Sequence, residues 1–268
     1  MPEVAVSGCE IHYELADLTP PWISAPETIL FHHGLGSTSG IWAQWLPLLA
    51  DRFRIIRLDM RGHGQSKFPE VGAPVTLDIL TDDVLTVADA AGAKRFHLVG
   101  ESIGGTIALN AAVRHRERLL SLTVSNGAHV GGSIESVHDW RQIINAYGMA
   151  GWSKHMMPRR FFDAAITADM WRWYEREQAN ISPDFLLAAL AALVSTDLAP
   201  KLKTIDLPVL LMHGDSSPFI AINVMTDLKA QLPRCSLQVF AHARHGLPFS
   251  HAKECAETLR HFLGEHPV

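Results

Sequence analysis

Residues 96–109 read FHLVGESIGGTIAL, and this stretch organises the interpretation of the whole chain. A short apolar run leads into Gly-Glu-Ser-Ile-Gly, and an alanine-rich segment with helical character follows. This order predicts a strand, a sharp turn and a helix, with the hydroxyl of Ser102 exposed at the tip of the turn. Glycine at Gly100 and Gly104 removes the Cβ atoms that would collide where the strand reverses into the helix.

The composition predicts a globular protein with a large core. At 268 residues, of which 47% are hydrophobic, the chain can form one domain with an inserted sub-domain. Its net charge of −5 comes from interspersed residues of both signs, which favours neither nucleic acid nor an anionic membrane as a partner. No apolar run is long enough to span a bilayer, and the first residues lack a basic start and an apolar signal core.

The cysteines and histidines indicate the compartment and argue against a metal. Cys9, Cys235 and Cys255 are far apart and odd in number, so we expect unpaired thiols in a reducing, cytoplasmic environment. The 15 histidines are scattered and show no metal-ligand spacing, so we expect neither a metal nor a cofactor.

Strands and helices alternate on either side of this stretch. Residues 4–6 and 10–14 flank a Ser-Gly turn and predict a hairpin. Strand-like runs at 28–31, 53–58, 119–124, 207–212 and 237–240 alternate with helical patterns at 41–49, 77–91, 224–232 and 252–263. This rhythm predicts an α/β fold: a mostly parallel, twisted sheet with helices on both faces.

The rhythm is interrupted between residues 125 and 204, where the pattern is helical throughout and rich in Met and Trp. We therefore expect an α/β core formed by residues 1–124 and 205–268, with residues 125–204 inserted as a helical cap. Open α/β sheets bind ligands at the carboxyl ends of their strands, which is where such a cap would lie. Trp152 is our candidate for lining the substrate site beneath it.

Five features in this order resemble the α/β-hydrolase superfamily along essentially the whole chain. They are HGLG at 33–36, DMRGHGQS at 59–66, GESIGG at 100–105, the helical insertion and the late His245. The nearest likeness is to compact bacterial 3-oxoadipate enol-lactonases and their esterase relatives. The resemblance implies a nucleophile at Ser102 and an oxyanion hole formed by the backbone N–H groups of Leu35 and Ile103. The 59–66 loop is interpreted as structural, with Arg61 paired locally.

His245 is the candidate general base. Serine is a weak nucleophile and needs an adjacent base, and imidazole can accept its proton at neutral pH and return it to the leaving group. His242 and His251 are the alternatives, but in the family the base precedes the final helix at the distance from the strand that His245 has.

The third member of the triad departs from the family pattern. In the family, the acid usually lies three residues after the glycine that ends the next-to-last strand, and here that position is Ser217. We favour Asp215, in the same loop, as the acid. The alternatives are an acid after the strand that ends at Val124, where Ser125 and Asn126 are uncharged, or a Ser-His dyad with a polar helper.

The resemblance implies a serine hydrolase that cleaves a small carboxylic ester or lactone through an acyl-enzyme, on a small-molecule substrate with an apolar part. Two alternatives remain: a carbon-carbon bond hydrolase of the meta-cleavage type, and a non-catalytic ligand-binding protein on a hydrolase scaffold. A serine at position 102 disfavours relatives that use a carboxylate nucleophile. The sequence leaves substrate identity and oligomeric state open.

Overall fold

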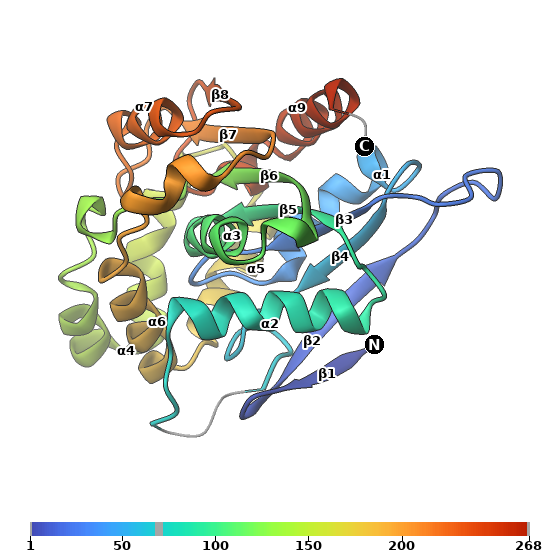
Figure 1. Cartoon of the computed structure of the whole chain (residues 1–268). Coiled ribbons are helices and arrows are strands. Elements are labelled where there is room, and N and C mark those ends of the chain that lie inside the picture. Colours follow the sequence, from blue (N-terminus) through green and yellow to red (C-terminus); the bar gives the residue numbers. More distant parts are fainter. Residues whose placement is uncertain (1, 68–71, 267–268) are drawn as a thin grey trace.

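The computed structural model describes residues 2–67 and 72–266, and a mostly parallel sheet runs through its centre (Figure 1). In the described residues the sheet has eight strands in the order β1-β2-β4-β3-β5-β6-β7-β8. β1 and β2 are antiparallel to each other, β2 is antiparallel to β4, and the remaining pairs are parallel. The strands are β1 (Glu3–Val6), β2 (Cys9–Ala16), β3 (Thr28–His32), β4 (Arg54–Leu58), β5 (Phe96–Glu101), β6 (Leu119–Ser125), β7 (Val209–Gly214) and β8 (Cys235–Phe240). The predicted α/β class and the opening hairpin are confirmed.

Helices cover both faces of the sheet, because alternate residues of the central strands point to opposite sides. One apolar cluster joins Leu30 and Ile56 to α2 (Leu77–Ala90), α3 (Ile103–Arg114) and α7 (Ile222–Gln231). The other joins Ile29 and Phe31 to the 3-10 helix η1 (Ser39–Trp45), α1 (Leu46–Leu49) and α9 (Ala252–Glu265). The sequence therefore encodes two cores on either side of one sheet.

The amphipathic helix expected at residues 41–49 is mostly 3-10. It is η1 up to Trp45, and α1 begins at Leu46 with a proline in its first turn. Proline has no N–H to donate to the preceding turn, so it suits the start of a new helix better than the interior of a long one. Short 3-10 helices or single turns also occur at η2 (Arg116–Arg118), η3 (Gly131–Ser133), η4 (Ala199–Thr204) and α8 (Leu247–Ser250).

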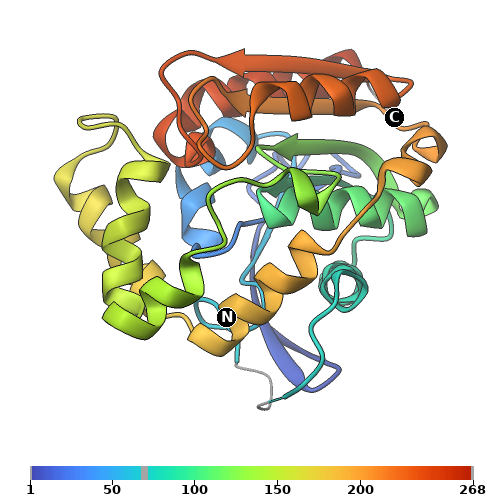
Figure 2. The same cartoon turned by 90° about the vertical axis from the view of Figure 1, so that its left-hand side faces the viewer.

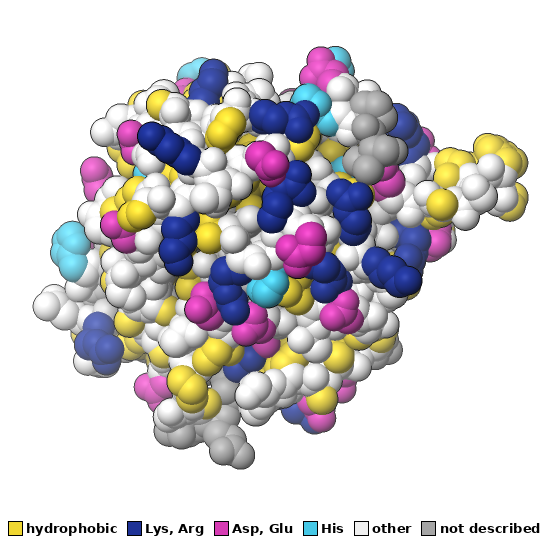
Figure 3. All heavy atoms as spheres, viewed as in Figure 1, with side chains coloured by type: hydrophobic (Ala, Val, Ile, Leu, Met, Phe, Trp, Pro, Cys, Tyr) yellow, Lys and Arg dark blue, Asp and Glu magenta, His cyan; other side chains and the backbone are white. Residues whose placement is uncertain are grey.

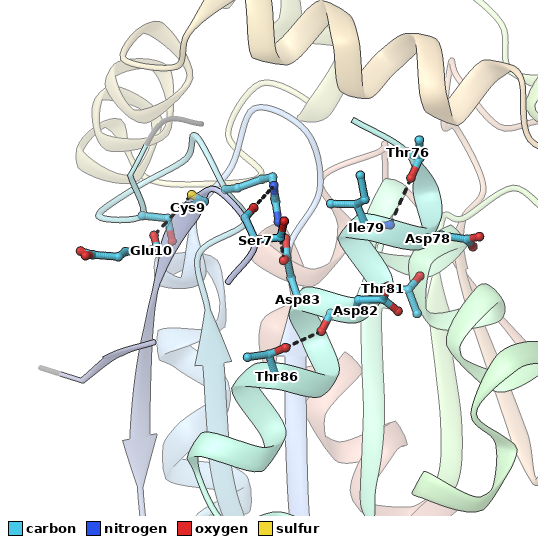
Figure 4. A network of polar contacts seen from close by, with 12 residues as sticks. Ser7, Cys9, Glu10, Thr76, Asp78, Ile79, Thr81, Asp82, Asp83 and Thr86 are labelled. Atoms are coloured by element: carbon cyan, nitrogen blue, oxygen red, sulfur yellow. Dashed lines mark hydrogen bonds and ion pairs between the residues drawn. The ribbon is translucent and has the colours of Figure 1, made fainter. Parts of the chain in front are cut away.

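α2 is fixed at its start and along its inner face by side-chain hydrogen bonds (Figure 4). The Thr76 hydroxyl accepts a hydrogen bond from the Ile79 N–H, which satisfies one of the free donors of the first turn. Further along, buried Asp83 accepts from the Arg61 Nε at 2.6 Å. Arg61 therefore ties the 59–66 loop to a helix 22 residues away, a longer-range partner than the local one expected from the sequence.

Between β6 and β7 the chain forms α4 (Trp140–Arg160), α5 (Ala168–Ala179) and α6 (Pro183–Val194), which we call the cap. Figure 1 shows α4 and α6 at its left, at one end of the sheet, and labels α5 nearer the centre; Figure 2 shows the same helices from that side. A single antiparallel bridge between Val130 and Asp197 joins the two chain segments at its base. α4 bends at Gly148, whose φ of 66° lies in the left-handed region. Ser125 belongs to β6, so the insertion starts one residue after the expected boundary.

Charges of both signs are interspersed on the face of the molecule drawn in Figure 3. The apolar projection at its right lies where Figure 1 places the loop between β2 and β3, a loop that includes Leu18 and Trp22, which are 71% and 82% exposed. Within the described residues, each helix is too short or too polar to traverse a lipid bilayer.

Candidate active site

Ser102 lies at the turn between β5 and α3, as the sequence predicted. Its φ of 56° and ψ of −121° are unusual for a residue with a side chain, and its N–H donates to the Ser125 carbonyl at 2.9 Å. The turn leaves no room for side chains at its glycines: a Cβ at Gly104 would lie 2.6 Å from the His32 carbonyl oxygen. The packing that excludes a side chain there is what presents Ser102 at the carboxyl end of β5.

His245 is the histidine that the fold brings to Ser102. Its Nε2 lies 2.9 Å from the Ser102 Oγ, and its ring meets the Phe219 ring edge-on at a centroid distance of 4.8 Å. The Asn126 amide fixes the loop that carries it: Nδ2 donates to the His245 carbonyl at 3.0 Å, and Oδ1 accepts from the Gly214 N–H at 3.1 Å. A single side chain thus links the ends of β6, β7 and β8.

The alternative histidines lie elsewhere. His242 is exposed, and its backbone has a φ of 55°. The His251 Nδ1 pairs with the Ser250 hydroxyl at 2.9 Å. His245 is the member of this group whose ring is placed to accept the proton of Ser102.

The His245 ring is held in the protonation state of a base. Burial, with smaller effects from the charges of Arg160 and His213, holds its pKa well below the ordinary value of 6.5. The ring is therefore neutral near pH 7 and carries one proton. Nε2 can accept the Ser102 proton only if that one proton is on Nδ1.

The Nδ1 atom of His245 faces Ser217 at 3.0 Å. The Ser217 Oγ also accepts from the Ile220 N–H at 3.4 Å, which leaves its remaining lone pair for the Nδ1–H of His245. This arrangement favours the tautomer with the proton on Nδ1, in which the Nε2 lone pair is free to accept the Ser102 proton. Ser217 therefore orients the ring as a triad acid does, but it has no charge with which to stabilise the protonated ring.

Asp215, the acid favoured from the sequence, does not reach the His245 ring, and the structure corrects that prediction. Its carboxylate accepts from the N–H groups of His242 and Ala243 at 3.1 and 3.2 Å, and from the Ser216 hydroxyl at 2.9 Å. These bonds direct the side chain toward the turn after β8. Asp215 shapes the loop that carries the histidine.

The two expected oxyanion donors flank the nucleophile. Ile103 is the first residue of α3, where an N–H has no acceptor within its own helix. Leu35 lies in the loop after β3 and lines the same cavity as Ser102. The Leu35 carbonyl accepts from the Arg160 Nη2 at 2.5 Å, so a cap residue holds the loop that contains Leu35.

The loop after β3 is also joined to the 59–66 loop through buried histidines. The His33 Nε2 accepts from the Met60 N–H at 2.9 Å, and the His63 Nε2 accepts from the Gly36 N–H at 3.3 Å. Burial lowers the pKa of both rings, which keeps them neutral and able to accept. These contacts support the structural role that we expected for the 59–66 loop.

A cavity lies between Ser102 and the cap. Most of its lining is apolar, and Arg160 is the cationic side chain in it. Its walls come from the strand ends and from the cap: Leu35, Ser102, Thr106, Asn126, Ala128, Ile134, Val137, Trp140, Met156, Arg160, Leu190, Leu193, Phe219, Ile220 and His245. The space suits a small, largely apolar ligand.

Trp152, the expected lining residue, is not part of this wall. It is fully buried and packs edge-on against Trp140 at a centroid distance of 5.0 Å. Trp140 takes the lining position instead. Both residues lie on α4, and the helical pattern alone does not distinguish the tryptophan that faces the cavity from the one behind it.

Arg160 is the functional residue that sequence reasoning missed most clearly. It is 2% exposed, its Nε donates to the Gln178 Oε1 at 2.7 Å, and its own carbonyl accepts from the Gly246 N–H at 3.0 Å. It thus contacts the loop after β3 through its side chain and the loop that carries His245 through its backbone. The sequence feature that could have identified it is an arginine at the end of a cap helix, because a charge that becomes buried there needs a partner.

No grouping of three or more His, Cys, Asp and Glu side chains suited to a metal ion exists within residues 2–67 and 72–266.

Comparisons with known proteins agree with this fold. The family described as "alpha/beta hydrolase fold" matches residues 27–184. A relative from Caulobacter sp. strain K31, assigned the name carbamate hydrolase RutD, is 30% identical over 227 residues, which cover 82% of this chain and 84% of the relative. The 3-oxoadipate enol-lactonase 1 of Acinetobacter baylyi is 29% identical over 205 residues, covering 75% and 76%. The solved structure of the enol-lactonase from Burkholderia xenovorans LB400 matches with a TM-score of 0.86 and 25% identity, covering 98% of this chain and all of that one.

Proposed function

The chain belongs to the α/β-hydrolase family, and from this premise we propose that it is a serine hydrolase acting on a small carboxylic ester or lactone. The observation that carries the proposal is the 2.9 Å contact between the Ser102 Oγ and the His245 Nε2 at the base of an apolar cavity. A nucleophile, a neutral base and a space for substrate occur together at the strand ends.

The reaction follows from the positions of these groups. Ser102 attacks the substrate carbonyl, and its Oγ–H bond breaks as Nε2 of His245 takes the proton. The N–H groups of Leu35 and Ile103 stabilise the resulting oxyanion. Collapse expels the alcohol, which receives the proton from His245 and leaves an acyl group on Ser102. Water then attacks this acyl-enzyme with His245 again acting as the base.

The apolar lining supports a substrate with a hydrophobic part. In a lactone the alcohol and the acyl group belong to one molecule, so both would occupy the same cavity. The relatives are named for hydrolysis of a carbamate and of an enol-lactone. A carbamate also has a carbonyl carbon that Ser102 could attack in the same way.

Steady-state hydrolysis of p-nitrophenyl acetate and butyrate, a simple γ-lactone, an aryl carbamate and a vinylogous diketone that yields a dienoate, with calorimetric binding of the same compounds, tests this proposal. We expect turnover of an ester or the lactone, and we expect Ser102→Ala to reduce kcat/KM by at least about 10³-fold. A rate that survives Ser102→Ala would contradict the acyl-enzyme mechanism. Turnover confined to a dienoate carbon-carbon bond would favour the meta-cleavage alternative, and saturable binding without turnover of any compound would favour a binding protein.

A further inference from the structure

The catalytic histidine lacks the carboxylate that usually balances its charge. The Ser217 hydroxyl at Nδ1 is neutral, and the Asp215 carboxylate is bonded to the backbone of the neighbouring turn. When Nε2 takes the proton of Ser102, the ring becomes a buried cation next to Arg160, whose charge already disfavours the protonated ring. A buried cation in this position needs a nearby negative charge.

Glu101 places a carboxylate on the other side of the same ring. It is the last residue of β5, immediately before the nucleophile, and its Oε1 lies 3.8 Å from the His245 Nε2. The two side chains are 2% and 5% exposed. Neither Glu101 oxygen makes a hydrogen bond of good geometry among the described residues. A buried carboxylate without a well-formed hydrogen bond is rare in a folded protein and calls for an explanation.

The backbone is shaped to admit this side chain. Gly34 lies against it, and a Cβ at Gly34 would overlap the Glu101 carboxylate. A residue with a side chain at position 34 would therefore displace Glu101 from its place next to the nucleophile.

Three charged or titratable groups surround the Glu101 carboxyl. They are His245 in the loop after β8, Arg160 at the end of α4, and Tyr174 on α5. Burial raises the pKa of Glu101 to about 7, and the Arg160 charge and the nearby Gly34 N–H offset this only in part. Tyr174 remains protonated, since burial raises its pKa above 10.

We propose that the Glu101 carboxylate stabilises the protonated His245 ring during acylation, acting from the Nε2 side in place of a triad acid at Nδ1. The inference rests on the proposed function. At 3.8 Å the carboxylate is too far for a hydrogen bond, so it acts through its charge, and no proton passes to it. The Ser102 proton moves to Nε2 while Glu101 stays ionised. Glu101 is thus a positioning residue that acts through His245.

The rate of covalent labelling by a fluorophosphonate measures this effect without knowledge of the natural substrate. Ser102 attacks phosphorus, fluoride leaves, and His245 takes the proton, so the labelling step requires the protonated ring. For the wild type we expect the second-order rate constant to rise with pH through about 7, as Glu101 ionises. Glu101→Gln should remove this rise and slow labelling about tenfold to a hundredfold above pH 8. Glu257→Gln, which removes an exposed carboxylate on α9, is the control and should keep the wild-type pH profile.

A second variant tests the same charge from the other side of the ring. Ser217→Asp places a carboxylate at Nδ1, so in that background Glu101→Gln should cost much less than in the wild type. Circular dichroism spectra establish that each variant is folded.

The outcomes separate the two proposals. A folded wild type that fails to label would overturn the proposed function. Labelling of the wild type with an unchanged rate and pH profile in Glu101→Gln would leave the function standing and overturn the role of Glu101. An equal cost of Glu101→Gln in the wild-type and Ser217→Asp backgrounds would overturn it as well, even if the single variant were destabilised.

Discussion

Two carboxylates lie buried at the carboxyl ends of two strands in the sheet, and they differ in their hydrogen bonding. Asp59, just after β4, and Glu101, at the end of β5, are each 1% exposed. The Asp59 oxygens accept from the N–H groups of Ser39 and Gln65 at 2.7 and 2.9 Å. Those of Glu101 make no hydrogen bond of comparable geometry in the described part of the chain, although the Gly34 N–H lies nearby. The Asp59 carboxylate holds two loops in place. Burial of the Glu101 carboxylate destabilises the folded state, and this group lies next to the reacting atoms.

The histidines of the two regions differ in the same way. The ring nitrogens of His33 contact the Met60 N–H and the Gly34 carbonyl, and those of His63 contact the Gly36 N–H and the Arg61 carbonyl. Such rings are fixed by the backbone. Both nitrogens of His245 face serine hydroxyls, so this ring can exchange a proton without breaking the fold.

The largest effect expected from this comparison concerns stability at high pH. Because the pKa of Glu101 rises from 4.5 to about 7 on folding, its stabilising effect is complete below pH 4.5 and is lost as the pH rises through 7. The loss amounts to about 3 kcal/mol, at about 1.4 kcal/mol per pKa unit. Glu101→Gln should therefore gain up to about 3 kcal/mol relative to the wild type between pH 4.5 and pH 8.

Urea unfolding at both pH values measures this difference. Comparing the variant with the wild type cancels the contributions of buried histidines that lie away from Glu101, such as His63, because these are the same in both proteins. A stability difference that does not change with pH would show that the pKa of Glu101 is not raised on folding. It would contradict the view that Glu101, unlike Asp59, is buried at an energetic cost.

Asp59→Asn should act in the opposite direction. The amide has one oxygen to offer the two N–H donors, and its NH₂ group faces the other donor, so we expect a loss of about 2 kcal/mol in the free energy of unfolding. The chemistry of Ser102 should persist in the molecules that remain folded. A variant as stable as the wild type would mean that the Asp59 bonds contribute little.

Ser217→Ala tests how much the hydrogen bond at Nδ1 contributes to the orientation of the His245 ring. It removes the acceptor at Nδ1 and leaves that N–H buried without a partner, which costs about 1–2 kcal/mol. We expect kcat/KM for a p-nitrophenyl ester to fall about tenfold. A loss of several orders of magnitude would indicate that Ser217 does more than orient the ring.

The smallest effect is expected for Asp215→Asn. Its carboxylate bonds to the turn after β8 and not to the His245 ring, so kcat/KM should stay within a few-fold of the wild type. The measurement uses the same p-nitrophenyl ester, and the kcat/KM of Asp215→Asn is compared with that of Glu101→Gln. A loss of about 10⁴-fold, as expected for a triad acid, would return Asp215 to that role.

The sequence predicted the parts of the site that depend on local chain geometry. The Gly-x-Ser-x-Gly turn and the late histidine follow from the spacing of strand, turn and helix, and the structure brings Ser102 and His245 together. The partner of Nδ1 depends on the path of a loop after β7, where a shift of two residues exchanges Asp215 for Ser217. Local patterns do not encode such differences.

The residues contributed by the cap escaped prediction for a related reason. Trp140 and Trp152 lie on one helix, and a bend at Gly148 between them alters which face meets the cavity. Arg160 gains its partners from loops more than 80 residues away. Glu101 was visible inside the motif, but its lack of partners appears only in three dimensions.

The most direct test of the central claim is the site at which a fluorophosphonate binds covalently. Peptide mapping of the labelled protein by mass spectrometry should place one adduct on Ser102, and the adduct should be lost in Ser102→Ala and strongly reduced in His245→Gln. An adduct on another residue, or labelling of Ser102 that does not depend on His245, would contradict the account.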